Sequence, residues 1–170
     1  MTELYLISNG ARPTTAVQVA VTTGTNIKTM LQVKLGRAVQ RARVVEWGIS
    51  FDGSAAATPI VVELLTTKTV AATVTAHVAA GVVNLDPRGN APTDLDPFDF
   101  GTAATGFTAS GEGTVTDTRP LDTQFIAPTN QFVKQWPLGR EPEFDQNEFL
   151  RVRLNAGAAV NAYAYVIIEV

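Results

Sequence analysis

Residues 43–65 read RVVEWGISFDGSAAATPIVVELL, and this stretch decides the fold. Its first half alternates, and one side of the extended chain carries Val45, Trp47, Ile49 and Phe51. Small turn-forming residues follow at 52–55, and a second alternating run places Ile60, Val62 and Leu64 on one face. Apolar residues at every second position, interrupted by Gly and Pro, indicate half-buried antiparallel strands. We therefore expect the side from Val45 to Phe51 to face a core.

Similar short alternating runs occur along the rest of the chain. We expect strands at 4–7, 16–21, 27–35, 114–118, 124–126, 131–136, 149–154 and 159–170. Residues 36–43 leave a single helical turn open, and residues 69–83 fit both helical and strand spacing, although their β-branched content favours a strand. About eight to ten short strands separated by turn signals predict an all-β fold, an antiparallel β-sandwich with jelly-roll topology.

Residues 84–113 are rich in Pro, Gly and Asp, which predicts one long irregular loop. A loop of this length inside a compact domain usually serves function or assembly. Three phenylalanines, Phe98, Phe100 and Phe107, would anchor the loop to its own sandwich or to a neighbouring subunit. Shortening the loop between Arg88 and Ser110 should then leave the sandwich folded, because the cost of loop closure changes slowly with length.

The length of 170 residues favours a single domain over residues 1–170, with residues 1–14 as a possible N-terminal arm. Only 17% of the residues are charged, against about 25% in ordinary globular proteins. A surface with so few charges is poorly soluble alone, so we expect partners to cover part of it. The net charge of −3 gives no basic field that would hold nucleic acid. The N-terminus does not resemble a signal peptide, and no apolar run reaches the length that spans a membrane.

Charge is distributed unevenly along the chain. The first quarter is basic, with Lys28, Lys34, Arg37, Arg41 and Arg43, whereas the middle is acidic. Two interpretations stay open: two solvated faces, or complementary contact with neighbouring copies or a larger assembly. Under the second interpretation Arg37 and Arg41 are candidate assembly contacts.

Residues suited to catalysis or metal binding are scarce. The chain has no cysteine and one histidine, His77, in an Ala/Val run, and it contains no G-x-S-x-G elbow. Acidic residues cluster at 141–148, but in a Pro-containing loop. The Asp and Asn residues of 84–99 could bind calcium, although turn formation explains them as well. We expect no enzyme activity, no catalytic residue, no metal site and no cofactor.

Three stretches together resemble a family of small virion-associated β-sandwich proteins from tailed bacteriophages and prophages. They are WGISFDGSAAATPIVVELL at 47–65, QWPLGREPEF at 135–144 and LRVRLNAGAAVNAYAYVIIEV at 150–170, and the L-D-P piece at 85–87 also fits. The resemblance implies a capsid decoration, or cement, protein on the outer surface of the virion head. Its implied partner is the major capsid protein. The low charge fraction and the uneven charge further predict a homotrimer, which would sit at local three-fold positions.

A second interpretation is a tail-associated module that binds a receptor or a carbohydrate. Trp136 with Tyr163 or Tyr165 could stack on a sugar ring, provided that these aromatics are exposed together. Trp136 is also a candidate assembly contact, because aromatic residues are enriched at interface hot spots. The position of the protein in the particle, many copies on the head or a few at the tail tip, distinguishes the two interpretations.

Overall fold

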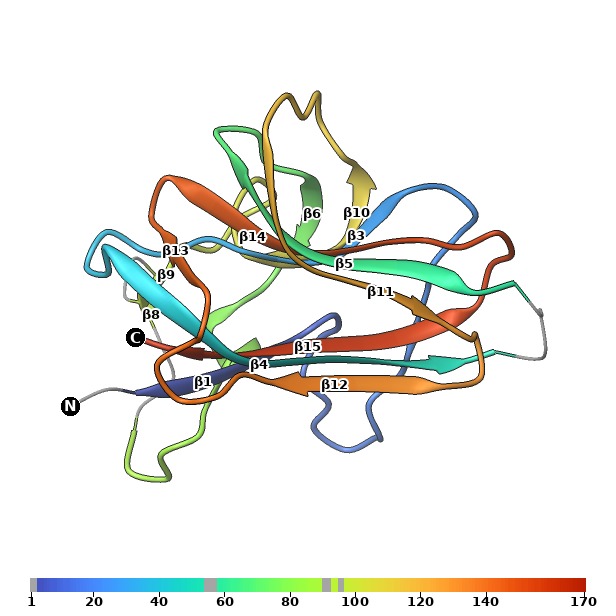
Figure 1. Ribbon diagram of the computed structural model, residues 1–170. Coiled ribbons are helices and arrows are strands. Elements are labelled where there is room, and N and C mark those ends of the chain that lie inside the picture. Colours follow the sequence, from blue (N-terminus) through green and yellow to red (C-terminus); the bar gives the residue numbers. More distant parts are fainter. Residues whose placement is uncertain (1–2, 54–57, 90–92, 95–96) are drawn as a thin grey trace.

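The computed structural model describes residues 3–53, 58–89, 93–94 and 97–170, and of residues 93–94 it describes the backbone alone. Two antiparallel sheets pack face to face (Figure 1). The first sheet has the order β12-β4-β15-β1-β7, with β2 beside β15 and β13 beside β4. Its strands are β1 (Leu4–Ser8), β2 (Val21–Thr22), β4 (Arg41–Asp52), β7 (Val83–Asn84), β12 (Gln131–Gln135), β13 (Glu143–Asp145) and β15 (Asn161–Glu169).

The second sheet has the order β11-β5-β14-β3-β10-β6. Its strands are β3 (Lys28–Val33), β5 (Ile60–Lys68), β6 (Thr73–Ala76), β10 (Gly106–Gly111), β11 (Thr118–Ile126) and β14 (Glu148–Asn155). A short parallel pair, β8 (Thr93–Asp94) with β9 (Pro97–Phe98), and a 3₁₀ turn, η1 (Ala79–Gly81), complete the described elements. The antiparallel β-sandwich expected from the sequence is confirmed, while the jelly-roll topology stays a prediction.

The core forms between the two sheets from the residues that alternation predicts. Trp47 is fully buried, and Ile49 and Phe51 belong to the same cluster. From the facing sheet, β5 contributes Ile60, Val62 and Leu64, and β14 contributes Leu150, Val152 and Leu154. At about 25 cal/mol per Å² of buried apolar surface, such interdigitated side chains supply most of the stabilisation of a sandwich.

The expectation for Val45 is wrong. Val45 is half-buried, and Val44 lies in the core instead, with 0% exposure. On β15, Ile167 pairs with Glu46 whereas the next residue, Ile168, pairs with Val44, so Val45 has no partner there. This extra residue is a β-bulge, which shifts the in–out alternation by one position. Before the bulge the even-numbered residues of β4, Ala42 and Val44, therefore point inward. After the bulge the odd-numbered residues from Trp47 to Phe51 point inward.

Residues 84–113 do not form one irregular loop, which corrects the sequence expectation. β10 pairs with β3 on one side and β6 on the other, inside the second sheet. Phe98 is fully buried and meets Tyr5 edge to face, with ring centroids 5.4 Å apart. A deletion between Arg88 and Ser110 would thus remove a central strand and a core aromatic. Residues 90–92 and 95–96 lie outside the described part of the chain.

A close approach between strands explains why the sequence of β10 reads as a loop. A Cβ added at Gly106 would lie 2.4 Å from the carbonyl oxygen of Thr75 on β6. Glycine is therefore required at this position, although in a sequence it usually marks a turn.

Residues 10–20 connect β1 and β2, which both pair with the same side of β15. β4 pairs with β15 along residues 161–169, so β1, opposite 165–169, and β2, opposite 161–162, both lie on its other side. Asn9 fills the step between β1 and β2: its Nδ2 donates to the Ala162 carbonyl at 3.0 Å, and its Oδ1 accepts from the Ala164 amide at 2.9 Å. Residues 10–20, named the excursion below, are thus looped out of an otherwise continuous sheet edge.

The strand expected at 16–21 is consequently wrong over most of its length. Only Val21 and the following Thr22 pair with β15, and the exposed valines Val17 and Val19 lie in the excursion. The expectation for 114–118 is also displaced, because the strand there, β11, begins at Thr118.

Candidate functional site

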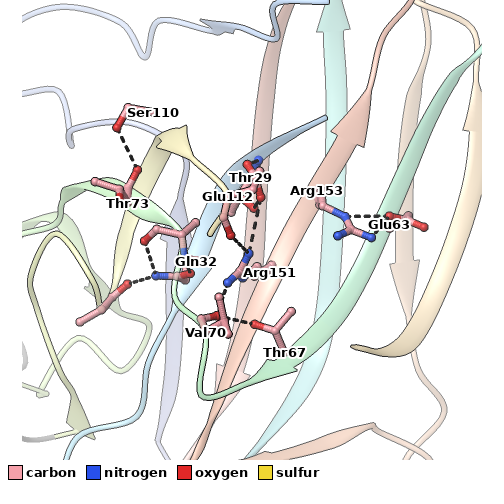
Figure 2. Close-up of polar contacts among 12 residues, drawn as sticks. Thr29, Gln32, Glu63, Thr67, Val70, Thr73, Ser110, Glu112, Arg151 and Arg153 are labelled. Atoms are coloured by element: carbon pink, nitrogen blue, oxygen red, sulfur yellow. Dashed lines mark hydrogen bonds and ion pairs between the residues drawn. The ribbon is translucent and has the colours of Figure 1, made fainter. Parts of the chain in front are cut away.

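One buried charged side chain, Arg151, lies on the outer face of the second sheet (Figure 2). Arg151 on β14 has 0% exposure, and its guanidinium donates to the carbonyl oxygens of Val70 and Glu112. The Glu112 carboxylate is 3.5 Å from the same guanidinium and accepts from Thr29 Oγ1 at 2.6 Å. Burial lowers the pKa of Arg151 to about 10, so the group stays charged at neutral pH. Arg151 therefore clamps the β5–β6 and β10–β11 connections onto the sheet.

Gln32 on β3 performs the same task for the neighbouring segment. Its Oε1 accepts from the Ala72 amide at 2.8 Å, and its Nε2 donates to the Ala104 carbonyl at 2.7 Å. Buried polar groups that bond backbone in this way stabilise covering loops. The Gln32 amide is engaged with backbone on both sides, which indicates a structural role.

A polar hollow of about 500 Å³ lies at one end of the sandwich. Its ionisable lining comes from both sheets and comprises Arg41, Lys68, Asp117, Arg119, Glu143, Asp145 and Glu148. Glu148 is buried: its Oε1 accepts from Thr66 Oγ1 at 3.1 Å and its Oε2 pairs with Arg119 at 2.9 Å. In the acidic cluster of 141–148, Glu143 and Glu148 are paired with arginines, while Glu141 and Asp145 accept from backbone amides. Within the described residues no group of three or more His, Asp and Glu side chains is placed to hold a metal ion.

His77 lies inside the molecule, as expected for a structural histidine. Its Nε2 is 2.7 Å from the Ser8 carbonyl oxygen, and its ring packs on Phe107 with centroids 4.7 Å apart. Burial lowers the pKa of His77. The ring is therefore neutral at pH 7, with the Nε2 proton donated to Ser8.

The candidate contact phenylalanines are anchored within the chain. Phe98 has 0% exposure, so it offers no surface to a neighbour, and this candidate assembly contact is corrected. Phe100 packs partly buried against the main core. Phe107 is half-buried beside His77. Phe98 and Phe100 are thus anchored to the chain's own sandwich, whereas Phe107 keeps part of its ring accessible.

The other candidate contacts differ in accessibility. Arg37 is exposed in the β3–β4 connection, and Arg41 is exposed with its guanidinium 3.5 Å from Glu143. Trp136 packs half-buried against the core, with the Lys134 ammonium 5.2 Å from its ring centroid. The arginines thus remain available to a partner, whereas Trp136 presents only part of its ring.

The tyrosines of β15 lie on the outer face of the first sheet. Tyr163 and Tyr165 are half-exposed, with ring centroids 6.1 Å apart and planes at 30°. The Tyr165 hydroxyl donates to Glu46 at 2.6 Å. Trp136 lies on the opposite face, because it shares the inward side of its strand with Lys134. The structure therefore does not combine Trp136 with either tyrosine in one aromatic site.

Two projecting segments present apolar side chains to solvent. Residues 137–140 form a tight turn, in which the Arg140 amide donates to the Pro137 carbonyl at 2.9 Å and Gly139 has φ of +81°. Its second residue, Leu138, is 95% exposed. In the excursion, Val17 is 83% exposed and Val19 is 70% exposed. Contiguous exposed apolar surface marks contact sites, whereas single exposed apolar side chains occur on ordinary protein surfaces as well.

Comparison with known proteins adds no relative. A scan against family models gives no match, and searches of curated proteins and of solved structures give no significant match. Among the described elements, none is a helix long and apolar enough to cross a membrane.

Sequence reasoning did not single out Arg151, Glu112, Leu138 or Val17. The exposure of Leu138 could have been predicted, because an apolar residue between Pro and Gly lies in a tight turn, away from the core. The burial of Arg151 could not have been predicted, because its alternation with Leu150 and Val152 is that of any outward-facing residue of a strand.

Proposed function

We propose that this chain is a decoration protein of a tailed-bacteriophage head. It binds the outer surface of the assembled shell, contacts the major capsid protein, and does so as a homotrimer at local three-fold positions. The three stretches that carry the family resemblance form β4 with β5, the 137–140 turn with its flanks, and β14 with β15. These parts are the centre of the sandwich and one of its projecting turns.

The observation that carries the proposal is the placement of uncovered apolar side chains. Leu138, Val17 and Val19 project from the 137–140 turn and the excursion, outside a core that is already closed by other residues. Water around such side chains is released when they contact a partner. A domain that presents apolar groups on projecting segments is suited to docking on a larger assembly.

Multivalency makes the proposed role effective. A trimer on a three-fold point touches several shell subunits at once, so each contact after the first is intramolecular. Weak contacts from a few valines and leucines then give long retention on the particle. Such contacts span neighbouring subunits and oppose their separation.

Quantitative mass spectrometry of particles from cells that carry the gene tests this proposal. We expect the protein in purified heads at a fixed ratio to the major capsid protein, and its release to lower the temperature at which the heads open. Particles without the protein, or with a few copies confined to the tail, would contradict the proposal.

One observation favours a second candidate function, carbohydrate binding. Tyr163 and Tyr165 form a flat aromatic pair beside the Glu46 carboxylate. Aromatic faces pack on the apolar side of sugar rings, and a neighbouring carboxylate accepts hydrogen bonds from their hydroxyls. A glycan array with the wild type and with Tyr163→Ala tests it, and binding that survives this substitution would contradict the assignment.

A further inference from the structure

The two stacked sheets have their edge strands on the same two sides of the sandwich. β11 and β12 are the edges on one side, and β6 and β7 are the edges on the other. The 137–140 turn directly follows β12, so Leu138 lies near that edge of the first sheet. An apolar hollow lies on the second side. These two features cannot meet within one molecule.

The hollow has a volume of about 650 Å³ and lies between the base of the excursion and the segment from β6 to η1. Its apolar lining includes Pro13, Ala76, Val78, Ala80 and Phe107. Val78 is 67% exposed at this site. The hollow therefore offers both an apolar floor and an apolar rim to a side chain that enters from outside.

The 137–140 turn is built to present Leu138 in one conformation. The Arg140–Pro137 hydrogen bond closes the turn, and the Gly139 amide donates to Glu141 Oε2 at 2.7 Å. A preorganised apolar side chain loses little conformational entropy when it is bound. Leu138 is thus a better anchor than an equally exposed leucine on a loose loop.

Charge complements the apolar match. The exposed Arg12 lines the hollow, whereas the carboxylate of Glu141 lies beside Leu138. Opposite charges at the border of an apolar contact favour the correct register. Arg140, the other charge of the turn, is exposed and has the same sign as Arg12, so the contact requires its guanidinium to stay in solvent.

We propose that Leu138 of one copy inserts into the hollow between the excursion and β6 of a second copy of this chain. The contact joins two different surfaces, so it is head-to-tail, and it closes a ring where the rotation from one copy to the next divides a full turn. It is the contact through which the trimer of the proposed function would form, and in that respect it rests on that proposal.

Complementation between two variants of the full chain tests the contact. Leu138→Asp removes the inserted side chain and keeps the hollow, whereas Val78→Asp spoils the hollow and keeps Leu138. Sedimentation should show oligomers for the wild type and, for each variant alone, self-association weakened roughly tenfold or more. An equimolar mixture of the variants should form one-to-one dimers, because one intact contact remains. Ile27→Asp, a substitution at another exposed apolar residue, is the control and should leave the assembly unchanged.

Several outcomes would overturn the contact. They are a wild type that stays monomeric at its highest soluble concentration, a mixture of the two variants that does not associate, and native mass spectrometry that finds a small molecule in the hollow. A monomeric wild type that still coats phage heads would overturn this contact and leave the capsid assignment standing. Trimers that form through this contact but bind no particle would support the contact and overturn the capsid assignment.

Discussion

The ring of Tyr165 lies across Gly48 on the neighbouring strand, so that a Cβ added at Gly48 would be 2.6 Å from Tyr165 Cε1. The two residues are direct cross-strand partners of β15 and β4. Glycine in a central strand costs backbone entropy, and an aromatic ring packed over it compensates by covering the exposed backbone. The same ring position lets the Tyr165 hydroxyl reach Glu46.

Gly48→Ala should therefore lower the free energy of unfolding by about 1–3 kcal/mol, because the new methyl group displaces the ring. Denaturant unfolding measures this change. Gly111→Ala is the control: nothing lies within 4 Å of its added Cβ, so we expect a change within about 0.5 kcal/mol. In the Tyr165→Ala background Gly48→Ala should cost much less, and full additivity of the two substitutions would contradict the packing described.

Arg151→Met should destabilise the fold by about 3 kcal/mol, because it removes the cation paired with Glu112 and one donor from each of the Val70 and Glu112 carbonyl oxygens. Arg153→Met is the matched control, since Arg153 and Glu63 form a partly exposed pair at 2.8 Å, and it should cost about 1 kcal/mol or less. Hydrogen exchange should speed up in residues 68–73 and 111–117 in the first variant alone. Equal costs for the two variants would show that Arg151 is no clamp.

Stability should fall as the pH drops below about 6.5, because the unfolded chain then protonates His77 while burial keeps the pKa of the folded state lower. The slope contributed by one group is at most about 1.4 kcal/mol per pH unit. His77→Gln keeps a donor for the Ser8 carbonyl and removes the titration. Unfolding measured at pH values of about 7.5 and 5.5 should therefore show a smaller difference for this variant than for the wild type.

Val17→Ser with Val19→Ser should leave the unfolding free energy within about 0.5 kcal/mol of the wild type, because both side chains are exposed. Under the proposed function it should weaken attachment to phage heads, measured by co-sedimentation. Thr14→Ser with Thr15→Ser, a double change in the same excursion, is the control. A double valine variant that coats heads as well as the wild type would show that the excursion is not a docking element.

Replacing residues 12–19 by a short Gly-Ser link tests whether the excursion is separable from the sheet. Asn9 and Thr23 each bond to β15 independently of the residues between them, through Ala164 and Val160. We expect the shortened protein to fold, with a change of about 1 kcal/mol or less. Loss of cooperative unfolding would mean that the excursion contributes to the core.

Local sequence determined the all-β fold class and most of the strand residues that face the core. Trp47, Ile49 and Phe51 are buried as their spacing predicts, and so are Ile60, Val62 and Leu64. Period-two alternation is a property of the extended backbone itself, so neighbouring residues suffice to reveal it.

Tertiary structure alone decided where alternation breaks and what the irregular segments do. The bulge at Val45 depends on the register of β15, more than a hundred residues away in the chain. Gly106 serves the close approach of Thr75, Asn9 fills a gap in the ladder of β15, and Arg151 is buried by two distant connections. Each of these roles arises from contacts between segments far apart in sequence, and short-range patterns carry no information about such contacts.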